Sequence, residues 1–241
     1  MLSSIVGGRG VNGVSARAGA PPDAAEQQRG IPVNRDMNEE NLPRDIRAFW
    51  FEETTSDPTA IAGRMGFWFG SDEARDRAME SRWSAEVESA FAGQLDTMGA
   101  TPLGRLALIL LLDQFPRNLF RATARAFERD GRARYLMRDG MSQQMDLALS
   151  PIERCFFYMP LQHSEFLDDQ ESSVSRYRQL LSEVSVDQQD VFQGFLDYAR
   201  LHRDIIARFG RFPHRNLTLN RLSTAEERTY LAGNAPRFGQ A

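Results

Sequence analysis

The chain has 241 residues, 41% of them hydrophobic and 26% charged, which is long enough for one large domain or two small ones. Its formal net charge of −4 argues against a general nucleic-acid binder, because a phosphate backbone requires a basic protein surface. All 29 basic residues are arginine, which excludes a Schiff-base lysine and a phosphate-loop lysine. The single Cys155 excludes an intrachain disulfide, and no apolar run approaches the roughly 20 residues of a membrane helix. We therefore expect a cytoplasmic protein that binds neither nucleic acid nor membrane.

The chain divides into three parts by composition. Residues 1–40 are rich in Gly, Ala and Arg and lack hydrophobic periodicity, which predicts a disordered N-terminal arm. Residues 41–235 are expected to form a single all-α domain, followed by a C-terminal tail at 236–241. No window alternates apolar and polar residues with the period of a strand. About eight helices joined by short links indicate an array of packed helix pairs.

Helix boundaries follow from capping residues, prolines and glycines. Thr101 before Pro102 is a good start signal, Gly210 is a stop signal, and Pro116 and Pro160 are expected to end the helices before them. Residues 223–226 (Ser-Thr-Ala-Glu) form a capping box for a last short helix. In chain order we expect helices over 44–53, 72–98, 102–115, 130–147, 151–159, 168–184, 187–209 and 224–232.

The segment 103–120 (LGRLALILLLDQFPRNLF) is the most informative part of the chain. Its apolar run, Leu106–Leu112, leads directly into Asp113 and Gln114. A helix that is apolar on every face is buried on every face. Its polar end is therefore expected where neighbouring helices also end, and where a solvent-lined site can form.

Several phrases resemble one bacterial family, the domain of unknown function numbered 924. They are FWFG at 67–70, TPLGRLALILLLDQFPRNLFR at 101–121, RAF at 125–127, FYMPLQHSEFLDDQ at 157–170 and FLDYARLHRDIIARFGRFPHRN at 195–216. The resemblance covers residues 44–233 and implies a tetratricopeptide-like all-α superhelix, without implying an activity. This chain carries Phe166 where the family pattern leads us to expect an acidic residue.

The three histidines lie within those phrases. His163, His202 and His214 lack a compact ligand spacing, and His163-Ser-Glu165 is a weak metal signal. We expect structural roles for them, with His202 packing on the turn that holds Tyr198, and we expect no metal or other cofactor.

The arginines of the C-terminal region suggest an anion site. Residues 200–215 contain five arginines and one acid, Asp204. Planar guanidinium groups on loops suit a carboxylate or phosphate. The alternative is that they pair with Asp113, Glu165, Asp168, Asp169 and Glu171 between helices. The candidate ligand-binding residues are Gln114, Arg117, Glu165, Arg203, Arg211, His214 and Arg215.

Three functions remain open. The preferred one is a binding module whose Arg- and His-lined pocket takes an anionic small molecule or a peptide end. The second is a hydrolase-like enzyme in which Asp113, at the end of the apolar helix, works with His163 or His214, with or without a metal. The third is a structural scaffold without a small ligand.

Overall fold

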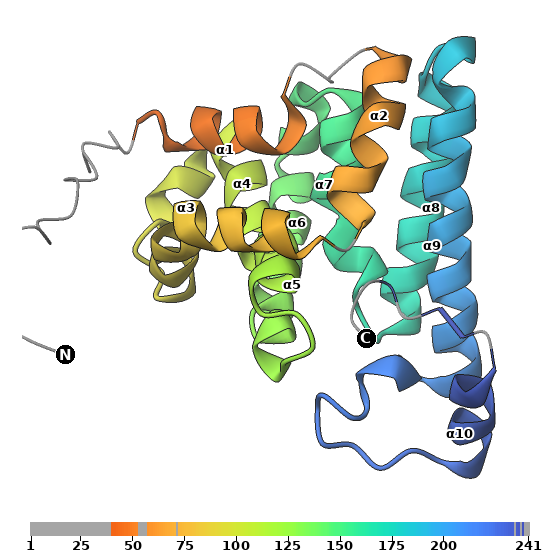
Figure 1. Ribbon diagram of the computed structural model, residues 1–241. Coiled ribbons are helices and arrows are strands. Elements are labelled where there is room, and N and C mark those ends of the chain that lie inside the picture. The colour runs from red at the N-terminus through yellow and green to blue at the C-terminus, as the bar shows by residue number, and fades with distance from the viewer. Residues whose placement is uncertain (1–39, 53–56, 71, 234, 237, 239–241) are drawn as a thin grey trace, which may run out of the picture. The chain divides into compact units, whose positions relative to one another are not determined.

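The structure is a computed structural model that describes residues 40–52, 57–70, 72–233, 235, 236 and 238. These residues are helical and contain no β-strand (Figure 1). The α-helices are α1 (Leu42–Phe51), α2 (Pro58–Phe69), α3 (Glu73–Phe91), α4 (Pro102–Ile109), α5 (Phe115–Leu119), α6 (Asp130–Ser142), α7 (Pro151–Gln162), α8 (Leu167–Glu183), α9 (Gln189–Phe209) and α10 (Ala225–Ala232).

The all-α prediction is confirmed, whereas the tetratricopeptide-like arrangement stays a prediction. Within the described residues, no helix is long and apolar enough to cross a membrane. The arm expected at 1–40 lies almost entirely outside the described residues, as does most of the tail at 236–241.

The helices differ from the sequence-based expectation in one missed helix and in several boundaries. Helix α2 was missed: Asp57 accepts a hydrogen bond from the Thr59 N–H and starts this helix, which includes the apolar patch 67–69. Helix α3 ends at Phe91 and α6 at Ser142, each earlier than expected. The final capping box is Thr224 with Glu227, one residue later than expected. Local signals located α3, α6 and α10 but did not fix their boundaries, which depend on packing.

The central segment confirms the prediction of complete burial but not the predicted stop. Leu106–Leu112 are each at most 1% exposed. Pro116 does not end the helix, because a π-helical turn, Leu110–Gln114, precedes it and the chain continues into α5. There the Phe115 N–H donates to the Leu110 carbonyl, five residues back. The wider turn relieves the clash that a proline ring causes in an α-helix, and π turns frequently occur at functional sites. Asp113 lies in this turn.

Gly104 lets the start of α4 approach the preceding 3-10 helix, Asp96–Ala100. A Cβ atom at residue 104 would lie 1.9 Å from the Met98 carbonyl oxygen. We therefore expect Gly104→Ala to lower the free energy of unfolding by about 2 kcal/mol or more, because backbone must move. Gly63→Ala is the matched control, since a Cβ there meets nothing within 4 Å. In this exposed helix interior it should stabilise by about 0.5–1 kcal/mol. Urea titrations of both variants measure the difference, and equal stabilities would contradict the packing described for Gly104.

The C-terminal helices bring distant residues to the end of α7. Helices α8 and α9 lie side by side, joined through the 3-10 helix Val186–Gln188, and α7 packs against α8 and α4 (Figure 1). Pro160 lies inside α7 rather than ending it. Gly210 ends α9 as predicted, in the left-handed conformation with φ of 68°. The chain then forms the 3-10 helix Pro213–Arg215, which contacts the residue that follows α7.

Candidate functional site

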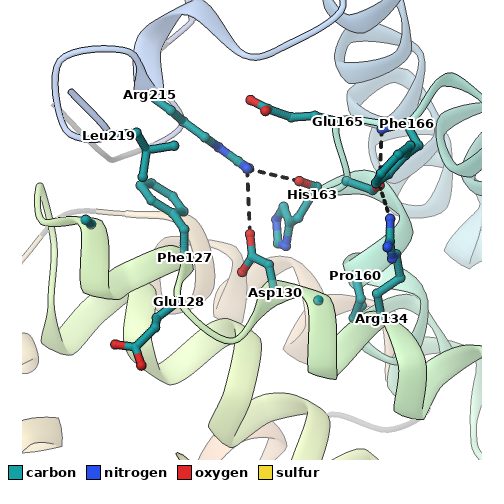
Figure 2. A pocket seen from close by; sticks show the side chains of 13 residues that line it. Phe127, Glu128, Asp130, Arg134, Pro160, His163, Glu165, Phe166, Arg215 and Leu219 are labelled. Carbon is teal, nitrogen blue, oxygen red and sulfur yellow. Dashed lines mark hydrogen bonds and ion pairs between the residues drawn. The ribbon is translucent and has the colours of Figure 1, made fainter. Parts of the chain in front are cut away.

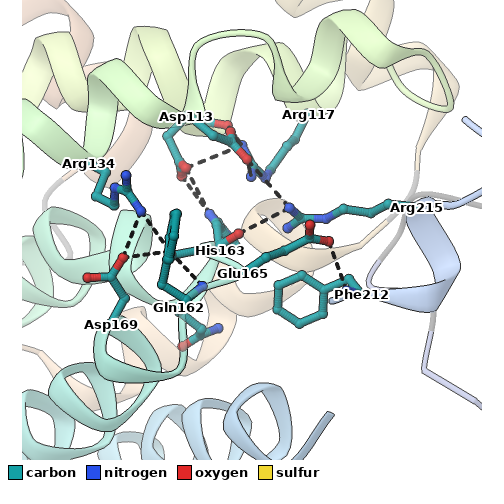
Figure 3. Close-up of polar contacts among 12 residues, drawn as sticks. Asp113, Arg117, Arg134, Gln162, His163, Glu165, Asp169, Phe212 and Arg215 are labelled. Carbon is teal, nitrogen blue, oxygen red and sulfur yellow. Dashed lines mark hydrogen bonds and ion pairs between the residues drawn. The ribbon is translucent and has the colours of Figure 1, made fainter. Parts of the chain in front are cut away.

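The acidic end of the central segment and the loop after α9 meet at His163. This residue caps the C-terminus of α7. Its Nδ1 atom lies 2.8 Å from Oδ1 of Asp113, and its backbone carbonyl accepts a hydrogen bond of 3.1 Å from Nη1 of Arg215 (Figure 3). Residues that are distant in the sequence, Asp113 and Arg215, therefore meet through His163.

Asp113 is a buried carboxylate with cationic and polar partners. Its side chain is fully buried, Nη1 of Arg117 lies 3.2 Å from Oδ1, and the amide of Gln114 donates to Oδ2. Burial alone would raise the pKa of Asp113, but Arg117 and His163 outweigh it and hold this pKa well below its usual value. Asp113 is therefore ionised at neutral pH, as a paired buried acid should be.

His163 is neutral, and its tautomer follows from Asp113. Burial and the nearby Arg117 lower the pKa of His163, and they outweigh the opposite effect of Asp113. Because a carboxylate can only accept hydrogen bonds, Nδ1 must carry the proton of the neutral ring. The lone pair then lies on Nε2, with which no described residue makes a hydrogen bond.

His163 lines a hollow of about 310 Å³, of which Asp113 is not a wall residue. Figure 2 shows His163 beside Asp130, beneath Arg215. The other walls come from the segment 124–134, the end of α7 and the loop after α9. The lining residues are Ala124, Phe127, Glu128, Asp130, Gly131, Arg134, Pro160, His163, Ser164, Glu165, Phe166, Arg215 and Leu219.

The carboxylates around this hollow are each matched by an arginine. Asp130 accepts two hydrogen bonds of 2.9 Å from Arg117. Glu165 accepts bonds of 2.6 and 3.0 Å from Arg221 and one of 2.8 Å from the Phe212 N–H. The remaining pairs are Glu128 with Arg129, and Asp169 with Arg134 and Arg138. The alternative of an ion-pair network is thus realised with the expected arginines at Asp113, which pairs with Arg117, and at Glu171, which pairs with Arg203. Glu165 and Asp169 are also paired, but with arginines outside the expected set.

Arg215 is the exception to this pairing. It is 7% exposed, and its nearest carboxylate oxygen, on Asp130, lies 3.6 Å away and is already bound by Arg117. The guanidinium lies over the Phe212 and Phe127 rings, 4.4 and 4.7 Å from their centroids. Its buried Nε has no hydrogen-bond partner among the described residues. Burial lowers the pKa of Arg215 to about 10, so it stays a cation at neutral pH without a carboxylate of its own.

Several sequence candidates lie outside the hollow. Arg203 pairs with Glu171 at 3.1 Å and Asp204 at 2.6 Å, and Arg211 makes two bonds of 2.6 and 2.8 Å to Glu227. Gln114 and Arg117 contact Asp113 and are not wall residues. The structure therefore brings together Asp113, Gln114, Arg117, His163, Glu165 and Arg215, whereas Arg203 and Arg211 do not line the hollow and bind carboxylates elsewhere.

His202 and His214 pack near His163 without reaching Asp113. The His202 ring lies 6.3 Å from the His163 ring, and its Nδ1 bonds the Tyr198 carbonyl at 2.8 Å, as its expected structural role requires. His214 packs 5.5 Å from Phe212, and burial followed by the positive charge of Arg215 lowers its pKa to about 3. In the part of the chain that the structure describes, no group of three or more His, Cys, Asp or Glu residues could hold a metal ion.

The sequence analysis missed most of the wall residues, including Asp130, Arg134 and Phe127. Asp130 was expected only as the first residue of a helix, although it accepts hydrogen bonds from Arg117 across the site. Arg134 donates to Asp169 and to Ser164 Oγ, and its guanidinium lies 4.5 Å from the centre of the exposed Phe166 ring. Phe127 lies in the segment 125–127 quoted for the resemblance, which was the one available signal. No local pattern marked these residues, because their partners are distant in sequence.

Comparison with known proteins identifies the family. A family model described as "Bacterial protein of unknown function (DUF924)" matches residues 46–235. The chain belongs to the DUF924 family. A solved structure of a protein of unknown function from Agrobacterium tumefaciens is 35% identical to this chain, covers 80% of it and 98% of that chain, and has a TM-score of 0.67. No curated protein matches the chain. The suspected relationship to DUF924 is thus confirmed, and the function has to be argued from the site.

Proposed function

We propose that the hollow beside His163 binds a small molecule through a carboxylate, with Arg215 as its cationic partner. The observation that carries this proposal is the incomplete pairing of Arg215. A buried charge is costly unless an opposite charge approaches it, and the protein supplies only a shared oxygen of Asp130, at 3.6 Å. A bound anion would complete the pairing.

The charges around the hollow favour a ligand with one negative charge over a ligand with two. Five carboxylates line the hollow or pair with the arginines around it, on Asp113, Glu128, Asp130, Glu165 and Asp169. Six arginines pair with them: Arg117, Arg129, Arg134, Arg138, Arg215 and Arg221. Arg117 serves both Asp113 and Asp130, and Arg134 and Arg138 share Asp169. Among these described residues one positive charge is therefore in excess, which matches a carboxylate better than a phosphate dianion.

The size and the walls suit a compact ligand with an apolar part. A hollow of about 310 Å³ is at the lower end of small-molecule sites. Phe127, Phe166 and Leu219 provide apolar contacts on its walls. A free carboxylate also occurs at the end of a peptide, so the same chemistry has two possible sources.

Thermal unfolding with carboxylate probes tests this function. At about ten times Kd a ligand stabilises the folded state by about 1.4 kcal/mol, which is a shift of about 3–5 °C for a chain of this size. We expect this shift with benzoate or butyrate and a smaller one with sulfate. A tripeptide with a free C-terminus and its amidated form distinguish a peptide end from a small molecule.

The matched variants are Arg215→Gln and Arg203→Gln. The first should abolish the shift, whereas the second should retain it, because Arg203 is outside the hollow. If no carboxylate raises the melting temperature of the wild type, or if Arg215→Gln responds like wild type, the proposed function is wrong.

The contact between Asp113 and His163 favours a second candidate function, acid–base catalysis in the same hollow. Of the two histidines considered as partners of Asp113, the hydrogen bond selects His163. His214 makes no hydrogen bond with a described residue and packs against aromatic rings instead.

A further inference from the structure

We infer that His163, held by Asp113, is the base that activates water to hydrolyse an ester whose carboxylate binds Arg215. This inference rests on the proposed binding function and adds to it a reaction and a substrate class. Its basis is the position of one imidazole, which contacts a buried carboxylate through Nδ1 and also forms part of the wall of the hollow.

The orientation of the His163 imidazole is fixed by Asp113, on the Nδ1 side of the ring. Both oxygens of Asp113 lie close to Nδ1, at 2.8 and 3.0 Å. Arg117 and Gln114 in turn bind the Asp113 carboxylate, so that it stays ionised and correctly placed. A base needs such a fixed tautomer, because only the nitrogen without a proton can accept one. Asp113 is therefore a positioning residue, and Nε2 of His163 is the proton acceptor.

The nucleophile is water, because the side chains that could act as nucleophiles are unsuitable. Ser164 lines the hollow, but its hydroxyl donates to Asp169 at 2.6 Å and accepts from Arg134 at 3.1 Å, and the residue is only 8% exposed. Cys155 is fully buried, and burial raises the pKa of its thiol well above the usual value. The sequence contains no lysine. A direct attack by water requires none of these side chains.

The reaction balances without a further reactant. Nε2 of His163 takes a proton from water while the water oxygen forms a bond to the ester carbonyl carbon, and the carbonyl π electrons move to its oxygen. When the tetrahedral intermediate collapses, the bond from carbon to the alcohol oxygen breaks. The imidazolium returns the proton to the departing alkoxide. The products are a carboxylic acid and an alcohol, and Asp113 stabilises the transient imidazolium.

The charged and titratable groups around His163 come from four segments. Asp113 and Arg117 belong to the central segment, Asp130 to the start of α6, Arg215 and His214 to the loop after α9, and His202 to α9 itself. Arg215 lies next to the base through its bond to the His163 carbonyl. A carboxylate on Arg215 would therefore bring the rest of a short substrate close to the imidazole.

The experiment measures 4-nitrophenolate release from mono-4-nitrophenyl succinate, with 4-nitrophenyl butyrate as an ester of similar length without the carboxylate. We expect the wild type to hydrolyse the succinate ester above the buffer rate, with kcat/KM rising with pH through one ionisation. His163→Gln should lose about 10²–10⁴-fold in kcat/KM. Asp113→Asn should lose at least about 10²-fold in kcat with little change in KM, because it disturbs the tautomer. Arg203→Gln is the control, with wild-type rates.

Each outcome decides one of the two claims. If butyrate stabilises the protein to heat but the succinate ester is not hydrolysed, or if His163→Gln retains the wild-type rate, the base is wrong and the binding site stands. If both esters are hydrolysed equally and only His163→Gln is inactive, the base stands and the carboxylate site at Arg215 is wrong. Circular dichroism establishes whether the variants fold. If Asp113→Asn does not fold, the rate of His163→Gln alone decides whether His163 is the base.

Discussion

Asp113→Ala is expected to lower the free energy of unfolding by about 3–5 kcal/mol, the usual cost of removing one partner from a buried ion pair. Asp113 is fully buried, and its removal leaves Arg117, which is 11% exposed, without one of its two carboxylates. It also removes the hydrogen-bond acceptor of His163. Urea unfolding at pH 7, monitored by circular dichroism, measures the loss.

Asp197→Ala is the matched control for this substitution. Asp197 pairs with Arg200 at 3.0 Å, but both side chains are well exposed, at 57% and 43%. An exposed pair of this kind contributes at most about 1 kcal/mol. If Asp113→Ala cost no more than Asp197→Ala, the central network would not be holding the end of α4 in place, and the fixed imidazole inferred above would lose its support.

The helical architecture could be predicted because it depends on local signals. Thr101 accepts a hydrogen bond from the Gly104 N–H as its capping pattern indicates, and Gly210 adopts the expected left-handed conformation. Pro116 shows where such signals fail. A proline predicts the end of an α-helix, but burial of the surrounding helix favours continuation through a π turn. That outcome depends on packing with distant residues, which a local rule does not contain.

The candidate site was only partly predictable for the same reason. Asp113 was identifiable because an acid directly after seven apolar residues must be buried and must find a partner. The arginine-rich segment 200–215 was a misleading signal for the ligand site, because it spans both α9 and the loop after it, and its arginines do not all line the hollow. Arg203, on α9, pairs with exposed acids outside the hollow, whereas Arg215, in the loop after α9, lies beside His163. Asp130 was expected only as the first residue of a helix, and no local pattern pointed to its contact with Arg117.

Acidification from pH 7 to pH 5 is expected to cause a large loss of stability, because the folded state disfavours protonation of all three histidines. Burial is the first cause in each case and lowers the pKa of His163, His202 and His214, the last to about 3. An unfolded histidine titrates near pH 6.5. Below that pH the unfolded chain therefore binds more protons than the folded one, and stability falls as pH falls.

The pKa of His214 gives the size of the expected loss in the free energy of unfolding. Each pH unit between the unfolded and folded pKa values costs about 1.4 kcal/mol per group, so His214 alone should cost about 2 kcal/mol between pH 6.5 and pH 5. His163 and His202 act in the same direction. Asp113, Glu165 and Asp169 have lowered pKa values, despite the opposing effect of burial, because arginines and hydrogen bonds stabilise their ionised forms. Their stabilisation is present above the unfolded carboxyl values and is lost only at more acidic pH.

Urea titrations of wild type and His214→Phe at pH 7, 6 and 5 isolate this effect. Phenylalanine keeps the aromatic contacts that His214 makes with Phe212 and Phe238, whose ring centroids lie 5.5 and 5.2 Å from it, but cannot be protonated. The variant should therefore lose about 2 kcal/mol less than wild type between pH 7 and pH 5. The same pH dependence in both proteins would show that His214 stays in contact with water, and that the loop carrying Arg215 does not close over the histidines.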